Sequence, residues 1–229
     1  MLTGLAWLAL EVKYLDPARS FYEERLDLSV RADAVDEVRY AAGDSELVLR
    51  RPSGVPRGGL HTHYACSIPV GEYDDWWDRL AATHELAESR FGDVRSLYLY
   101  DPDGNCVELG QRDVAGPGVD GIFEIALEVE SLERAESFYE VLGFETVDRG
   151  EERRRVRMQG PVAIELWEPQ LGIADARGGV HVDVGFRAPE PADAAAAVAD
   201  RACEVEYGSD EAVIRDPDGH YLTVRSEDS

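Results

Sequence analysis

The feature that most constrains the fold of this chain is an internal repeat. The segment LALEVKYLDPARSFYEERLDLSV (residues 8–30) matches IALEVESLERAESFYEVLGFETV (residues 125–147) at a constant offset of 117 residues. A second pair of segments also matches: GGLHTHYACSIP (residues 58–69) and GGVHVDVGFRAP (residues 178–189). Because a repeated sequence folds as a repeated structural unit, we predict duplicated modules rather than one continuous architecture.

A related turn and strand end each half of the repeat. They read DPDGNCVEL at residues 101–109 and DPDGHYLTV at residues 216–224, so that Glu108 is replaced by Thr223 in the second copy. Proline at the second position and glycine at the fourth are typical of a type I turn, with the aspartate bonding to the backbone. His220 falls within the second turn, and we expect it on the surface.

Each half divides again into two units, which gives four modules at about 4–52, 58–112, 121–169 and 178–226. In every module a short stretch of alternating apolar residues precedes an amphipathic helix and further alternating stretches. This order predicts an α+β fold of four β-α-β-β-β modules. Asp16 followed by Pro17 is expected to cap the first helix, and Ser131 is expected to cap the third.

The predicted domain boundary is a stretch that contains glycine and proline, VAGPGVD, at residues 114–120. We expect a first domain at residues 1–113 and a second domain at residues 121–229. A chain of 229 residues is long enough for two domains of about 110 residues each.

The charge of the chain restricts its partners. It has 47 acidic and 23 basic residues, a formal net charge of −24, and one lysine, Lys13. Nucleic acid is excluded as a partner, because binding to a phosphate backbone depends on clustered Lys and Arg. A dense acidic surface with almost no lysine is expected in a halophile, where concentrated salt screens the repulsion between like charges.

The sequence predicts a cytoplasmic protein without a membrane partner. No apolar run approaches the roughly 18 residues that a membrane span needs, and the first residues lack the features of a secretory signal. The cysteines are odd in number and show no CxxC spacing, which indicates neither a disulfide framework nor a thiolate zinc site. We expect all three to be small buried residues: Cys66, Cys106 and Cys203.

The whole pattern resembles the vicinal oxygen chelate superfamily, which includes glyoxalase I, extradiol dioxygenases, fosfomycin-resistance proteins, methylmalonyl-CoA epimerase and bleomycin-binding proteins. The resemblance rests on the FY pairs of the first and third helices, on HYA in the second module and on DPDGNCVEL at its end. GLHTHYACSIP and SLYLYDPDGNCVEL are especially similar to short two-domain relatives of catechol 2,3-dioxygenase. The resemblance implies two half-barrel mixed sheets, each made by two paired modules, with the helices outside.

The resemblance also implies two metal-ligand positions in each module, one on the first strand and one on the last. In modules two and three these positions hold side chains that can bind a metal: His63, Glu108, Glu124 and Glu165. In modules one and four the same positions hold residues that bind metal poorly or not at all: Trp7, Val48, Asp183 and Thr223. His181 is an alternative to Asp183 in module four. If module two pairs with module three, as in single-chain relatives of glyoxalase, one site is complete. Pairing within each half would instead leave both sites incomplete.

One histidine and three carboxylates form an oxygen-rich set suited to one divalent ion, which could be Fe, Mn, Ni, Co or Zn. Such an ion stabilises the enediolate that forms when a C–H proton leaves a small oxygenated substrate. Glu108 or Glu165 is the predicted base, in a reaction of the lyase or isomerase type. Four further residues are candidates for supporting the ligands or lining the pocket, with core packing as the alternative for the aromatic ones: His61, Tyr98, Tyr100 and Trp167.

Two other functions stay open at this point. Extradiol ring cleavage uses two histidines and one carboxylate on Fe(II), and Glu124 stands where the second histidine should be. A metal-free protein that sequesters a small molecule would not bring the four predicted ligands together. Because four modules can build both cavities within one chain, the sequence is compatible with a monomer or a homodimer.

Overall fold

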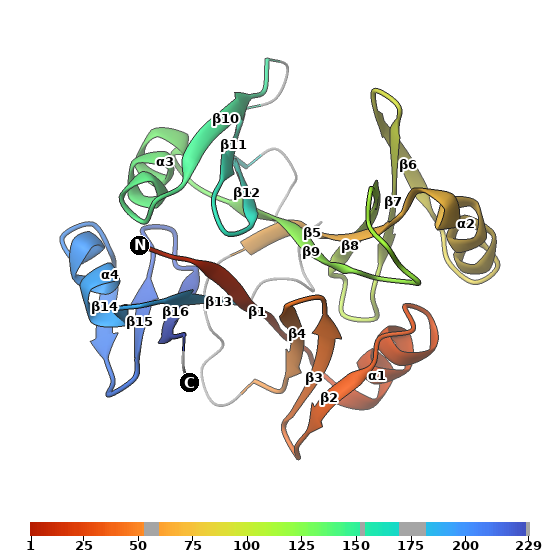
Figure 1. The fold of residues 1–229 in the computed structure, drawn as a ribbon, viewed down its shortest axis with the longest axis horizontal. Coiled ribbons are helices and arrows are strands. Elements are labelled where there is room, and N and C mark those ends of the chain that lie inside the picture. Colours follow the sequence, from red (N-terminus) through yellow and green to blue (C-terminus); the bar gives the residue numbers. More distant parts are fainter. Residues whose placement is uncertain (53–59, 152–153, 170–181, 228–229) are drawn as a thin grey trace.

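The structure is a computed structural model that describes residues 1–52, 60–151, 154–169 and 182–227. It consists of four units in chain order, each with a strand, a helix and three further strands (Figure 1). The first unit contains β1 (Gly4–Glu11), α1 (Leu15–Glu24), β2 (Val30–Asp33), β3 (Glu37–Ala42) and β4 (Ser45–Arg50). The second contains β5 (Leu60–Pro69), η1 (Val70–Glu72), α2 (Tyr73–Ala81), β6 (Ala87–Phe91), β7 (Val94–Tyr100) and β8 (Cys106–Arg112).

The second half of the chain has the same order. The third unit contains β9 (Gly121–Glu128), α3 (Leu132–Val141), β10 (Glu145–Arg149), β11 (Arg155–Gln159) and β12 (Ala163–Trp167). The fourth contains β13 (Val182–Ala188), α4 (Pro191–Val198), β14 (Glu204–Tyr207), β15 (Glu211–Arg215) and β16 (Tyr221–Ser226). Figure 1 places the four helices at the periphery of the molecule.

The strands form two mixed sheets of eight strands each. One has the order β14-β15-β16-β13-β1-β4-β3-β2, and the other has the order β10-β11-β12-β9-β5-β8-β7-β6. The first unit therefore joins the fourth through the antiparallel pair β1–β13, and the second joins the third through β5–β9. These sheets confirm the predicted α+β fold. They also confirm the cross-wise pairing that places the better ligand set in one sheet.

Helix α1 shows how the sequence produces this packing. Its buried side chains recur at helical spacing on one face, including Ala18, Phe21 and Tyr22. The helix begins at Leu15, so the prediction that Asp16 is its N-cap was wrong. Asp16 instead lies in the first turn, where a carboxylate interacts favourably with the helix dipole.

The third helix bears out its predicted cap. The Ser131 side chain accepts a hydrogen bond from the Arg134 backbone N–H at 3.4 Å, as expected of a serine that precedes a helix. The serine satisfies one of the donors that the first helical turn leaves without a partner inside the helix.

The aspartates of the two DPDG turns are buried acceptors as well as turn residues. Tyr22 on α1 donates a hydrogen bond to Asp101 at 2.8 Å, and Tyr139 on α3 donates one to Asp216 at 2.9 Å. In the second copy the His220 ring lies 2.8 Å from Asp216 and is completely buried. The prediction that His220 lies on the surface was therefore wrong. Each turn ties the helix of one unit to the last strand of the next unit.

The three cysteines differ in their burial. Cys66 is buried, as predicted, but Cys106 is only partly buried and Cys203 is exposed. Burial raises the pKa of the Cys66 and Cys106 thiols to about 12, so both stay protonated at neutral pH.

Within the described residues, no helix combines the length and apolar character that crossing a membrane requires.

Candidate metal centre

Three of the predicted ligands converge on the middle of the second sheet. Strand β5 lies between β8 and β9, and Ala65 pairs with Glu108 on one side and with Glu124 on the other. The His63 Nε2 atom lies 3.3 Å from Glu108 Oε2 and 3.4 Å from Glu124 Oε1. Both carboxylates are almost fully buried, with 3% and 4% of their surface exposed.

The arrangement follows from strand alternation and from one irregularity. Alternate residues of a strand share a face, so Glu108, Gly110 and Arg112 point to the same side of β8. The β5–β9 register shifts at Ala65, which leaves Phe123 as an extra residue beside Glu124. The Phe123 ring packs over Gly110, where an added Cβ would lie 2.9 Å from the ring. A larger residue at Gly110 would therefore displace the ring.

Glu108 is ionised in this setting. Burial raises its pKa, but the hydrogen bond and charge of His63, together with the Tyr98 hydroxyl, lower it by more, and the net shift is downward. Tyr98 pairs directly with Glu108 across β7 and β8. Burial and the Glu108 carboxylate raise the pKa of Tyr98, so its hydroxyl keeps its proton.

Glu165 is not part of this group of three. It is buried in β12, but its Oε1 atom lies 3.2 Å from an Arg155 nitrogen and 3.5 Å from an Arg157 nitrogen. Its Oε2 atom accepts a hydrogen bond from Trp167 Nε1 at 2.8 Å. The structure thus brings together His63, Glu108 and Glu124, and it engages Glu165 with two guanidinium groups and an indole.

Sequence reasoning missed the arginines of the site. Arg157 forms an ion pair with the buried Glu124 Oε2 atom. The guanidinium of Arg112 stacks 3.8 Å from the centre of the Phe123 ring. The run RRRVRMQG at residues 153–160 carries the signal, because alternate arginines on a strand beside IELW must face the same side as Glu165.

The three convergent side chains fit a divalent cation. Their ligand atoms all lie within 4.8 Å of one another. Two adjacent ligands at about 2.1 Å from one ion lie about 3 Å apart in octahedral geometry, which is close to the 3.3 and 3.4 Å found here. An imidazole nitrogen and carboxylate oxygens are a donor set that suits divalent first-row metals.

The other candidate residues differ in their relation to this centre. The rings of Tyr98 and Trp167 meet the His63 ring edge to face, with centroids 5.9 and 6.3 Å away. Tyr100 is 56% exposed at the end of β7. The side chain of His61, and His181 as a whole, lie outside the described residues.

Residues 4–109 match the family described as the Glyoxalase/Bleomycin resistance protein/Dioxygenase superfamily. By this match the first half of the chain is similar to proteins of this superfamily. The matched stretch covers units one and two, and units three and four repeat their fold. No match was found among curated proteins.

Solved structures share the fold over nearly the whole chain. A Bacillus subtilis protein proposed to be a dioxygenase superposes with a TM-score of 0.76 at 16% identity, over 100% of this chain and 86% of that chain. Glyoxalase I from Zea mays gives 0.72 at 17% identity, over 97% and 92%. The cppA protein from Streptococcus pneumoniae gives 0.62 at 11% identity, over 99% of each chain. At these identities the likeness establishes the fold and leaves the reaction open.

The second set of predicted ligand positions, in units one and four, is closed. Asp183 accepts hydrogen bonds from Thr223 Oγ1 at 2.8 Å and from Trp7 Nε1 at 3.2 Å, and it pairs with Arg50 at 3.1 Å. Trp7, Val48 and two alanines form a separate buried cluster there. The only carboxylate of this set is therefore satisfied by protein groups, and an indole occupies the concave face.

We expect Gly185→Ala to destabilise the fold through this indole. A Cβ at Gly185 would lie 2.2 Å from the Trp7 ring, so the ring or the strand must shift. The free energy of unfolding should fall by about 1 to 3 kcal/mol, measured by urea denaturation. Gly71→Ala is the control, because a Cβ at Gly71 meets no atom within 4 Å. Equal stability of the two variants would show that Trp7 does not pack as described.

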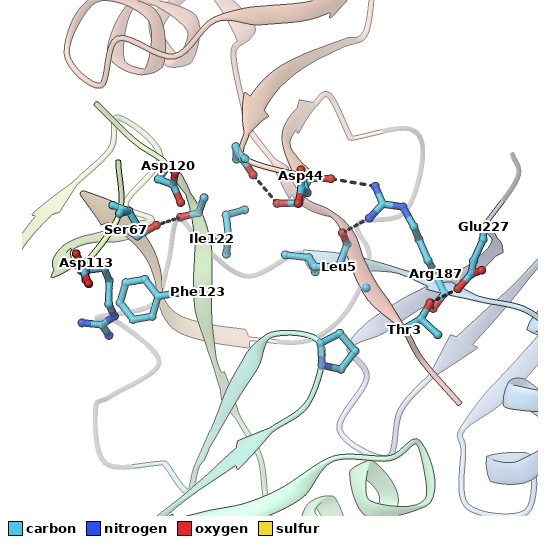
Figure 2. Close-up of a pocket in the computed structure, with 18 residues that line it drawn as sticks. Thr3, Leu5, Asp44, Ser67, Asp113, Asp120, Ile122, Phe123, Arg187 and Glu227 are labelled. Carbon is cyan, nitrogen blue, oxygen red and sulfur yellow. Dashed lines mark hydrogen bonds between the residues drawn. The ribbon is translucent and has the colours of Figure 1, made fainter. Parts of the chain in front are cut away.

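A separate cavity of about 900 Å³ is lined by residues of both sheets (Figure 2). Its wall is tied together by Arg187, which donates hydrogen bonds to the backbone oxygens of Leu5 at 2.7 Å and Asp44 at 3.0 Å. Arg112 and Phe123 also line it, but His63, Glu108 and Glu124 do not. The cavity therefore lies beside the three candidate ligands and is not lined by them.

Proposed function

We propose that this chain is a divalent-metal-dependent enzyme that enolises a small oxygenated substrate, in a reaction of the lyase or isomerase type. The observation that supports it best is the convergence of His63, Glu108 and Glu124 from three neighbouring strands. We further propose residues 1–113 and 121–229 as two duplicated domains that share both sheets. One chain then supplies every ligand of the centre.

The residues divide the work as follows. His63, Glu108 and Glu124 would hold the ion, which when bound polarises the adjacent oxygens of a substrate and stabilises an enediolate. Glu108 is the proposed base, because it is ionised and, among the described residues, forms no ion pair with an arginine. Glu165 is a poorer base, since Arg155 and Trp167 already occupy its oxygens.

The residues around the three ligands would position the substrate and supply positive charge. Tyr98 and Trp167 flank His63 and would hold a small substrate against it while excluding water. Arg155 and Arg157 contribute positive charge next to the carboxylates. Fixed positive charge at this place favours the negative charge that develops on an enediolate oxygen.

Metal analysis tests the proposal. Wild-type protein is expected to carry one equivalent of Mn, Ni, Co or Zn, and His63→Ala is expected to lose it, because one of three protein ligands is gone. Elemental analysis after gel filtration gives the stoichiometry, with His84→Ala as a control for loss of a histidine elsewhere. Iron together with oxygen uptake on catechol would instead favour ring cleavage. Full metal retention in His63→Ala would contradict the proposed centre.

A further inference from the structure

Arg157 occupies an unusual place for a residue three strands away from the centre of a metal site. It lies on β11, which pairs with β12, and β12 in turn pairs with β9, the strand of Glu124. Its guanidinium nevertheless forms an ion pair with Glu124 and lies 3.5 Å from Glu165. The side chain therefore extends across β12 to reach one of the three convergent carboxylates.

The packing under the Arg157 side chain allows its guanidinium to reach Glu124. Glu165 on β12 stands directly opposite Arg157 of β11. Ala163, also on β12, pairs with Glu124 of β9. Because residues 163 and 165 share a face, the alanine leaves the space between Glu165 and Glu124 open to the guanidinium. Only 28% of the Arg157 side chain is exposed, so the contact is not that of a surface ion pair.

The ion pair offsets the cost of burying two neighbouring carboxylates. Glu108 and Glu124 lie on either side of Ala65, and both are nearly fully buried. Two ionised carboxylates at that separation repel each other and lose hydration, which is unfavourable unless a cation compensates them. His63 contacts both carboxylates, and Glu124 Oε2 points instead to Arg157.

We propose that Arg157 is an internal cation that holds Glu124 through Oε2 and weakens the binding of a divalent ion at the same carboxylate. This inference rests on the metal centre of the proposed function. An ion held by His63, Glu108 and Glu124 Oε1 would lie close to the guanidinium, and the two cations would repel each other. Arg157 is thus a positioning residue that limits metal affinity and protects the fold when metal is scarce.

The same contact explains why Glu165 stands apart from the other three. Arg157 bridges Glu124 and Glu165, and Arg155 adds a second guanidinium to Glu165. The two arginines thus hold Glu165, one of the four expected ligands, away from the other three. The centre keeps two carboxylates and one imidazole, which leaves more positions on an ion for water or a bidentate substrate.

The test measures metal affinity and stability rather than turnover. Each protein is stripped with EDTA and dialysed, and Mn²⁺ binding is followed by calorimetry and by the EPR signal of free Mn²⁺. Arg157→Gln is expected to bind Mn²⁺ about tenfold more tightly than wild type, because a like charge next to the ion is removed. In EDTA the same variant is expected to unfold at a lower temperature than wild type, and Mn²⁺ should close the gap.

Arg155→Gln is the matched control. Arg155 lies on the same face of the same strand and is similarly exposed, at 24%, but its partners are Glu165 and Asp148. Its replacement should change Mn²⁺ affinity by less than about threefold, in keeping with a partly exposed ion pair. Arg157→Lys is the second variant, since it keeps the charge and loses the planar fork, and its affinity should fall between wild type and Arg157→Gln.

The outcomes separate this inference from the proposed function. If Arg157→Gln and wild type bind Mn²⁺ equally and His63→Ala does not bind, Arg157 is not a competitor and the metal centre stands. Binding by Arg157→Gln but not by wild type would support the competition and contradict the proposed enzyme. If neither protein binds Mn²⁺, both the metal centre and the role of Arg157 are overturned.

Discussion

Glu108→Gln is expected to lower the rate of metal-dependent C–H exchange by about 100- to 10,000-fold, the range that loss of a general base produces. The amide keeps the size of the side chain but cannot accept a proton. It also replaces a negative ligand by a neutral one, so bound metal should fall too. Exchange is followed by mass spectrometry of hydroxyacetone in D₂O, because its adjacent carbonyl and hydroxyl oxygens can bind one ion together.

Glu165→Gln is the matched comparison for this prediction. Both glutamates are buried on the concave face of the same sheet, but only Glu108 lies within reach of His63. Glu165 is already engaged by Arg155 and Trp167, so its replacement is expected to lower exchange by less than about tenfold. Metal content is measured on the same samples, which separates a lost base from a lost ligand. A larger loss in Glu165→Gln than in Glu108→Gln would reverse the assignment of the base.

Much of this fold was accessible from the sequence. The repeat fixes four equivalent units, and alternation within each strand fixes which residues face the concave side. The contrast between Glu108 and Thr223 was informative because both stand at one position of the repeat. Only cross-wise pairing of the units places Glu108 with Glu124, and the sheets are paired in this way. The ligand positions themselves were implied by the resemblance, and strand alternation with this pairing places three of them on one face.

The side chains that surround the centre were not accessible in the same way. The contact of Arg157 with Glu124 spans two strand pairings, and its reach depends on a small residue, Ala163, in the strand between them. The burial of His220 depends on Tyr139, a residue 81 positions earlier in the chain, through their common partner Asp216. The alternating arginines of residues 153–160 indicate the face of Arg157 but not its contact with Glu124, and the contact of His220 leaves no periodic pattern in its own segment.

The buried aspartate of the second DPDG turn is expected to be among the most sensitive positions for stability. Asp216→Asn should lower the free energy of unfolding by about 3 to 5 kcal/mol at pH 7, the range for a buried pair that loses one charged partner. The carboxylate accepts hydrogen bonds from Tyr139 and from the backbone of Asp218 and His220, and it also meets the His220 ring. Urea denaturation measures the change.

Asp101→Asn is the comparison, because Asp101 occupies the same position of the first turn and Asn105 replaces the histidine. Its replacement should lower stability by about 1 to 3 kcal/mol, the range for buried hydrogen bonds without a charged partner. Burial outweighs the hydrogen bonds of Asn105 and Tyr22, so the pKa of Asp101 is raised. For Asp216 burial also raises the pKa, but the charge and hydrogen bonds of His220 outweigh it and the pKa is lowered.

The two aspartates should therefore respond to acid in opposite directions. A lowered folded-state pKa means that Asp216 stabilises the fold above pH 3.8, and that this contribution is lost as pH falls through the folded-state pKa. A raised pKa means that Asp101 is most favourable when protonated, and that its contribution falls as pH rises from 3.8 through the folded-state pKa. The stability lost in Asp216→Asn should accordingly shrink on going from pH 6 to pH 3, while the loss in Asp101→Asn grows. Parallel pH profiles for the two variants would show that the His220 charge does not set the difference between the turns.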